Sequence, residues 1–104
     1  RWKSNDLFHS KYAREHSYFG ILESILRSKN RPLFIHNLNK SGILLIFYPE
    51  LGTSLRKRTL NLNKLKLANN LKSLIKLFRE SLKGENLNSF DKKMSLISDR
   101  IKNY

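Results

Sequence analysis

The chain contains no cysteine among its 104 residues. This absence excludes disulfide bonds and thiolate zinc sites, which stabilise many small secreted domains and zinc-finger nucleic-acid readers. Without such cross-links, folding must depend on packing alone.

Long hydrophobic runs are also missing. The longest strongly apolar stretch, residues 43–48, is far shorter than the roughly 20 residues that span a bilayer. The sequence therefore predicts no transmembrane segment, and any membrane contact would be interfacial. Because the first residue is arginine rather than methionine, we interpret the chain as a processed or trimmed product.

Acidic residues are scarce: eight Asp and Glu stand against 21 Lys and Arg, which gives a formal net charge of +13. Nine of the basic residues, against one acid, fall between Arg56 and Lys83. So large a charge repels itself in a compact fold unless a polyanion neutralises it. A nucleic acid or an anionic membrane surface is the class of partner that this imbalance favours.

The hydrophobic content is sufficient for a core. With 39% hydrophobic and 11% aromatic residues, the chain is too apolar for a disordered basic tail. We expect a single domain over residues 1–104.

Apolar residues from Tyr18 to Leu26 follow a helical spacing, which predicts an N-terminal helix. Pro32 should end this helix, because the residue before a proline is pushed out of the helical region. Residues 1–16 are interpreted as an extension or as the beginning of the helix.

Three short strands are predicted next. Residues 33–38 and 43–48 are rich in Ile and aromatics and are separated by a polar loop that contains Gly42, which is typical of a hairpin. Residues 59–63 alternate leucine with asparagine, which indicates a half-exposed edge strand.

Two helices should follow. Leucines recur at helical spacing from Leu67 to Leu82, with Asn63 as a candidate N-cap, and a second apolar stripe runs through residues 87–104. The predicted fold class is therefore α+β: a helix, a three-stranded antiparallel sheet and two C-terminal helices. Residues 17–83 would form an α-β-β-β-α unit. Because so small a sheet cannot cover three helices, we expect residues 87–104 to face a neighbouring protein.

The order of elements from Tyr18 to Phe78 resembles the double-stranded-RNA-binding domain. The run Asn63-Lys64-Leu65-Lys66-Leu67-Ala68 is similar to the basic cluster at the start of that family's second helix. The resemblance implies that Lys64 and Lys66 grip phosphates across the RNA major groove. The Gly-rich stretch that precedes the cluster in the family is missing here.

The composition as a whole looks like that of small basic mitochondrial ribosomal proteins. The chain is short and free of cysteine, it is rich in Lys and Asn, and its core residues are Leu, Ile and Phe. The resemblance implies a non-catalytic part of a ribosome or another ribonucleoprotein in the mitochondrial matrix. It also implies contacts with rRNA phosphates and with neighbouring proteins.

The candidate nucleic-acid-binding residues are the exposed cations expected in the basic region. Each phosphate that such a cation neutralises releases counterions and contributes affinity that depends on salt. These residues are Arg56, Lys57, Arg58, Lys64, Lys66, Lys72, Lys76 and Lys83.

Two alternatives remain open. Charge alone does not separate RNA from DNA, so a DNA-binding or nucleoid protein is the first. The second is a small metal-free ribonuclease that would use His36, Arg56 and Arg58. Three scattered histidines, His9, His16 and His36, form no metal-ligand pattern. No motif indicates a cofactor, a metal or a small-molecule ligand, and we expect no catalytic residues.

Overall fold

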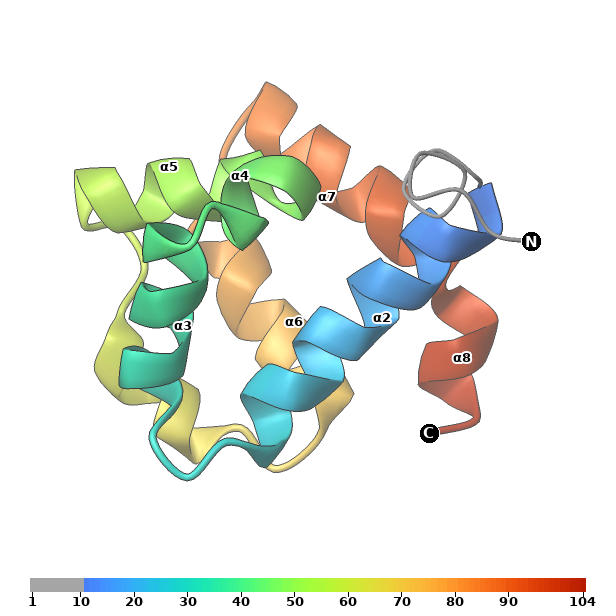
Figure 1. Cartoon of the computed structure of the whole chain (residues 1–104), viewed down its shortest axis with the longest axis horizontal. Coiled ribbons are helices and arrows are strands. Elements are labelled where there is room, and N and C mark those ends of the chain that lie inside the picture. Colours follow the sequence, from blue (N-terminus) through green and yellow to red (C-terminus); the bar gives the residue numbers. More distant parts are fainter. Residues whose placement is uncertain (1–10) are drawn as a thin grey trace.

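The computed structural model describes residues 11–104, and in this part of the chain every regular element is a helix (Figure 1). The elements in chain order are α2 (Lys11–Arg27), α3 (Arg31–Lys40), α4 (Ile43–Phe47), α5 (Pro49–Lys57), the 3₁₀ helix η1 (Leu62–Leu67), α6 (Leu71–Glu80), α7 (Glu85–Leu96) and α8 (Ser98–Lys102). The first ten residues, including His9, lie outside the described residues.

The predicted three-stranded sheet is wrong. Residues 33–38 belong to α3, residues 43–47 form α4, and residues 59–63 run irregularly into η1. The fold over residues 11–104 is all-α rather than α+β. The α-β-β-β-α topology on which the likeness to the double-stranded-RNA-binding domain depended is therefore absent.

Asn30 and two prolines, including the Pro32 that was expected to end a helix, lie at the beginnings of helices. The Oδ1 atom of Asn30 accepts a hydrogen bond from the backbone N–H of Leu33 at 3.2 Å, which caps α3. Pro32 and Pro49 lie in the first turns of α3 and α5, where a missing N–H costs nothing and a fixed φ favours the helix. A short apolar run fits a buried strand or a helix equally well, and at α3 the side-chain cap and the proline in the first turn favour the helix.

Gly42, which was expected in a hairpin loop, has a positive φ of 88°, and it connects two helices rather than two strands. Helix α4, which follows it, is apolar on all sides. Leu44 is fully buried, whereas Leu45 and Ile46 are 73% and 66% exposed. The strand predicted for residues 43–48 is therefore a short helix with one buried side.

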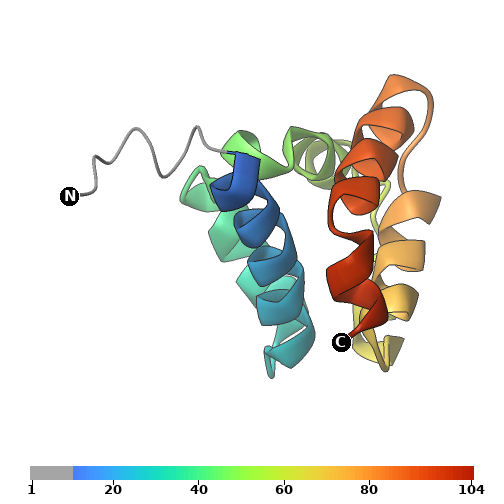
Figure 2. The same ribbon diagram turned by 90° about the vertical axis from the view of Figure 1, so that its right-hand side faces the viewer.

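Helix α2 contacts helices from both the N-terminal and the C-terminal halves of the chain. It packs against α3 and α4 on one side and against α6 and α7 on the other. Figure 2 shows the two layers, with α2 and α3 in one and α6, α7 and α8 in the other, and the α4–α5 segment crossing between them. Leu22 and Ile25 of α2 are completely buried between the layers.

Helix α6 has the predicted apolar stripe but a later start. Leu71, Leu74 and Phe78 are buried, while Leu67 is 73% exposed and belongs to η1. The N-cap is Asn70, whose Oδ1 accepts from the backbone N–H of Ser73 at 2.9 Å. The predicted cap at Asn63 is therefore wrong.

The C-terminal stripe belongs to the same core. Phe90 and Ile97 are 0% and 1% exposed, and the ring centroids of Tyr104 and Phe19 lie 5.7 Å apart. The expectation that this stripe lacks a place in the domain is wrong, because without a sheet the helices cover one another. The break between α7 and α8 occurs at Ile97, where φ is −112° and ψ is 15°.

Arg31, at the beginning of α3, connects this helix with the ends of α2 and η1 through hydrogen bonds to backbone carbonyl oxygens. Its guanidinium donates to Leu26 O at the end of α2, with Nη2 at 2.8 Å, to Ala68 O at 3.0 Å and to Leu65 O. Five N–H donors in a rigid plane allow one side chain to reach all three acceptors. The sequence had indicated this residue only as part of a helix end.

Replacing Arg31 should therefore destabilise the fold. We expect Arg31→Ala to lower the free energy of unfolding by roughly 2–4 kcal/mol, because several charge-assisted hydrogen bonds are lost. Arg31→Lys should recover less than half of this, since an ammonium cannot span the three oxygens. Urea unfolding followed by circular dichroism measures both; an Arg31→Ala protein as stable as the wild type would contradict the assignment.

Candidate nucleic-acid interface

All eight predicted cations are exposed at the surface. None forms an ion pair with an acid of the described chain. They lie in four places: Arg56, Lys57 and Arg58 at the end of α5; Lys64 and Lys66 on η1; Lys72 and Lys76 on α6; and Lys83 after α6.

A hydrogen bond brings the segment after α5 and the end of α6 together. The hydroxyl of Thr59 donates to the backbone O of Ser81 at 3.1 Å, so the segment that follows α5 lies beside the end of α6. Lys64 lines a hollow of about 130 Å³ at the same junction, together with Thr59 and Ser81. We call this region, with Arg58, Lys64 and Lys83 on its segments, the α5–α6 junction.

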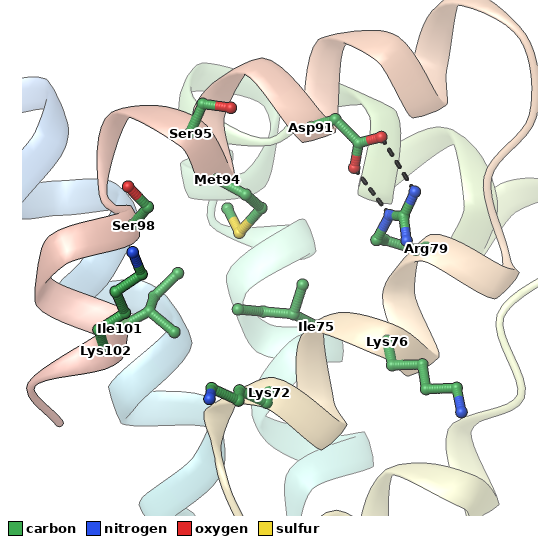
Figure 3. A pocket seen from close by; sticks show the side chains of 10 residues that line it. All are labelled: Lys72, Ile75, Lys76, Arg79, Asp91, Met94, Ser95, Ser98, Ile101 and Lys102. Carbon is green, nitrogen blue, oxygen red and sulfur yellow. Dashed lines mark hydrogen bonds and ion pairs between the residues drawn. The ribbon is translucent and has the colours of Figure 1, made fainter.

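Lys72 and Lys76 lie instead along a second feature, which we call the basic cleft. It is a hollow of about 670 Å³ between α6, α7 and α8. Its lining consists of Lys72, Ile75, Lys76, Arg79, Asp91, Met94, Ser95, Ser98, Ile101 and Lys102 (Figure 3). Four cations and one acid line it, so its surface is strongly positive.

Arg79 is held in place within this lining. Its Nε and Nη2 atoms donate to the two carboxylate oxygens of Asp91, at 2.8 and 3.2 Å. The two side chains are 50% and 41% exposed, so the pair lies at the surface. A two-point contact of this kind fixes the plane of the guanidinium.

Two of the cleft's cations were not among the predicted site residues. These are Arg79 and Lys102. Arg79 and Asp91 are twelve positions apart on different helices, and Lys102 follows the break at Ile97. No helical period in the sequence connects these positions.

The structure provides no metal or histidine centre among residues 11–104. No three His, Asp or Glu side chains of this part of the chain gather closely enough to hold a metal ion. His36 is exposed on α3, and no hydrogen bond connects it with Arg56 or Arg58. The three residues named for a ribonuclease are therefore not assembled by a hydrogen-bond network.

A second group of charged residues is buried and was missed entirely. Lys93 of α7 binds both carboxylate oxygens of Glu50 of α5, at 2.8 and 2.9 Å. The side chains are 14% and 2% exposed, and the Ser89 hydroxyl donates to the same carboxylate at 3.3 Å. Glu50 follows a proline in a segment that reads as a turn, where an exposed acid is the ordinary expectation.

Aromatic rings complete the surroundings of this ion pair. The Lys93 ammonium lies 5.4 and 5.7 Å from the ring centres of Tyr48 and Tyr18, within the range of cation–π attraction. The hydroxyl of Tyr48 donates to the backbone O of Tyr18 at 2.8 Å. Burial, and next the nearby Glu50 carboxylate, raise the pKa of Tyr48 well above its usual range.

This arrangement is closed to ligands. With a carboxylate that is 2% exposed and a Tyr48 ring that is fully covered, no substrate could reach it. We therefore assign the Glu50–Lys93 pair a structural role, and the exposed cations remain the candidate site. Comparisons with family models, curated proteins and solved structures found no match for this chain.

The two members of the buried pair should respond unequally to removal. Lys93→Met leaves the Glu50 carboxylate buried without a cation, so we expect a loss of roughly 3–5 kcal/mol in unfolding free energy. Glu50→Met should cost less, because the long Lys93 side chain can turn its ammonium toward water.

The double variant tests the pair as a unit. Because a buried ion pair often gains little over apolar residues of similar volume, Glu50→Met with Lys93→Met should be more stable than Lys93→Met alone. Denaturant unfolding of all four proteins supplies the cycle. Additive losses in the double variant would show that the two groups do not interact.

Proposed function

We propose that this protein is a non-catalytic RNA-binding component of a ribonucleoprotein. A mitochondrial ribosome, in the matrix, is the setting that the compositional likeness favours. The observation that supports the proposal most directly is that all eight predicted cations are exposed and unpaired within the described chain. Cations in this state are available to phosphates.

The ion pairs that the acidic side chains form also support the proposal. Among residues 11–104, ion pairs engage Glu23, Glu50 and Asp91, with Arg27, Lys93 and Arg79 as their partners. None of these acids neutralises a predicted site residue. A surface of this kind binds a nucleic acid chiefly through the phosphate backbone of the nucleic acid, with little dependence on base sequence.

A non-catalytic role agrees with the geometry of the titratable groups. The buried carboxylate of Glu50 is covered, and the exposed histidines His16 and His36 lie on different helices. General acid–base cleavage needs such groups within reach of one reacting atom. The proposal therefore gives the cations a binding role.

Neighbouring proteins are the second class of partner in this proposal. In residues 87–104 the apolar side chains left for such a contact are Leu96 and Tyr104, which are 46% and 50% exposed.

No helix of residues 11–104 has the length and apolar character to cross a bilayer.

The salt dependence of RNA binding tests the proposal. We expect the logarithm of the association constant to fall steeply with the logarithm of the salt concentration, because each phosphate contact releases counterions. Reversing the charge of Arg56 and Arg58 should weaken binding to all RNA sequences about equally. Fluorescence anisotropy with several unrelated RNAs measures both. A slope near zero would refute the proposed function.

Arg58 offers a test in which stability and binding change in opposite directions. It has φ 58° and ψ 32°, and it is the one residue other than glycine with positive φ in the described chain. This conformation costs an L-residue about 1–2 kcal/mol, and glycine commonly takes such a position after a helix. We expect Arg58→Gly to raise the unfolding free energy by about 1 kcal/mol while it weakens RNA binding.

Thermal unfolding and anisotropy on the same samples check this prediction. Lys57→Gly supplies the control, because it removes a neighbouring cation from a helical position and should lower both stability and affinity. If Arg58→Gly left RNA affinity unchanged, Arg58 would not belong to the interface.

A further inference from the structure

The basic cleft between α6, α7 and α8 combines two kinds of surface that a plain phosphate-binding face does not need. Cations occupy its rim, while Ile75, Met94 and Ile101 supply an apolar lining. It is an open hollow of about 670 Å³, a volume that can accept a small organic group. A duplex presents phosphates, riboses and the edges of paired bases, whereas the faces of its bases are stacked on one another, so an apolar lining suits a base that has left the stack.

We propose that the basic cleft holds one unpaired nucleotide of the bound RNA, such as the extruded residue of a bulge. The inference rests on the proposed RNA binding and goes beyond it, because it assigns a specific RNA feature to a specific site. An unpaired nucleotide carries an apolar ring face and an anionic phosphate, and these correspond to the two surfaces of the cleft.

The order of the side chains along the cleft supports this occupant. In Figure 3, Lys72, Ser98 and Lys102 lie toward one end, the Arg79–Asp91 pair lies at the other, and Ile75 and Met94 lie between them. Lysines and a hydroxyl at one end suit a phosphate and ribose. The apolar middle would then receive the base.

Arg79 supplies the surface against which the base would stack. Bases stack on guanidinium planes as well as on aromatic rings, and two hydrogen bonds to Asp91 fix this guanidinium at 2.8 and 3.2 Å. The side chain is still 50% exposed. A plane that is fixed before binding loses little conformational freedom when a base covers it.

The experiment compares two RNAs that differ by one nucleotide: a perfect duplex and the same duplex with a single-nucleotide bulge. We expect the wild-type protein to bind the bulged RNA about fivefold or more tightly, the lower end of what one stacked base contributes. Equal affinity for the two RNAs would overturn the inference while leaving the proposed function intact. Failure to bind either RNA would overturn both.

Asp91→Ala separates stacking from charge. The substitution releases Arg79 and makes the protein more positive by one charge, so electrostatics alone predicts tighter binding of every RNA. Our inference predicts that the preference for the bulged RNA falls below about twofold. Asp99→Ala is the matched control, because it makes the same charge change on α8 at an exposed acid that does not line the cleft. The control should keep the preference, and a preference retained in Asp91→Ala would overturn the role of Arg79.

Ser95→Trp provides a second variant that does not depend on charge. Ser95 is exposed and lines the cleft, so a tryptophan there should fill the space, with circular dichroism to confirm the fold. We expect loss of the bulge preference with unchanged affinity for the duplex. Preference retained in this variant would place the nucleotide elsewhere.

A competition experiment with a free nucleotide tests whether the cleft binds a nucleotide of the RNA or a free nucleotide. Adenosine monophosphate at concentrations that match the dissociation constant of the bulged RNA should not compete with it, because the rest of the RNA supplies most of the affinity. Competition at such concentrations would identify the cleft as a site for free nucleotides and overturn the assignment to RNA.

Discussion

A carboxylate that is 2% exposed needs a cation within the protein, because an unpaired charge taken out of water costs several kcal/mol. Lys93 meets this need for Glu50 and so sets the distance between α5 and α7. The rings of Tyr18 and Tyr48 enclose the same ammonium, which ties α2 to the pair. The position of α7 in turn defines one wall of the basic cleft. The arrangement of the proposed site therefore depends on an interaction that no ligand touches.

The scarcity of acids gives this burial a further effect. Eight carboxylates serve a chain with 21 basic residues, and Glu50 and Asp91 are engaged within the fold by Lys93 and Arg79. Few acids are then left to neutralise the outer surface. Each pair also engages one cation, so the formal net charge of +13 is unchanged, and the predicted cations, which belong to neither pair, stay available to a polyanion.

The two proposed binding features differ in what they recognise. The exposed cations on α5, η1 and α6 act through charge, so they would hold RNA wherever its phosphates pass. The basic cleft adds a shaped surface, in which the plane of Arg79 is fixed by Asp91. The strained backbone at Arg58 fits the same picture, because residues that break a local rule are concentrated at functional sites.

Residue types and local spacing determined part of this protein from the sequence alone. The exposure of all eight predicted cations was predictable, because a charged side chain with no local partner is placed in water. The stripe of Leu71, Leu74 and Phe78 was also predictable, since it depends on a single helical period.

Tertiary structure decided the rest. Whether residues 33–38 and 43–48 become strands or helices depends on what covers them, because a short apolar run fits both periods. Burial of the C-terminal stripe followed from that choice, since helices took the place of the absent sheet. The pairs Glu50–Lys93 and Arg79–Asp91 lie 43 and 12 positions apart. No local pattern encodes such contacts, because they arise only when packed helices bring distant charges to the same place.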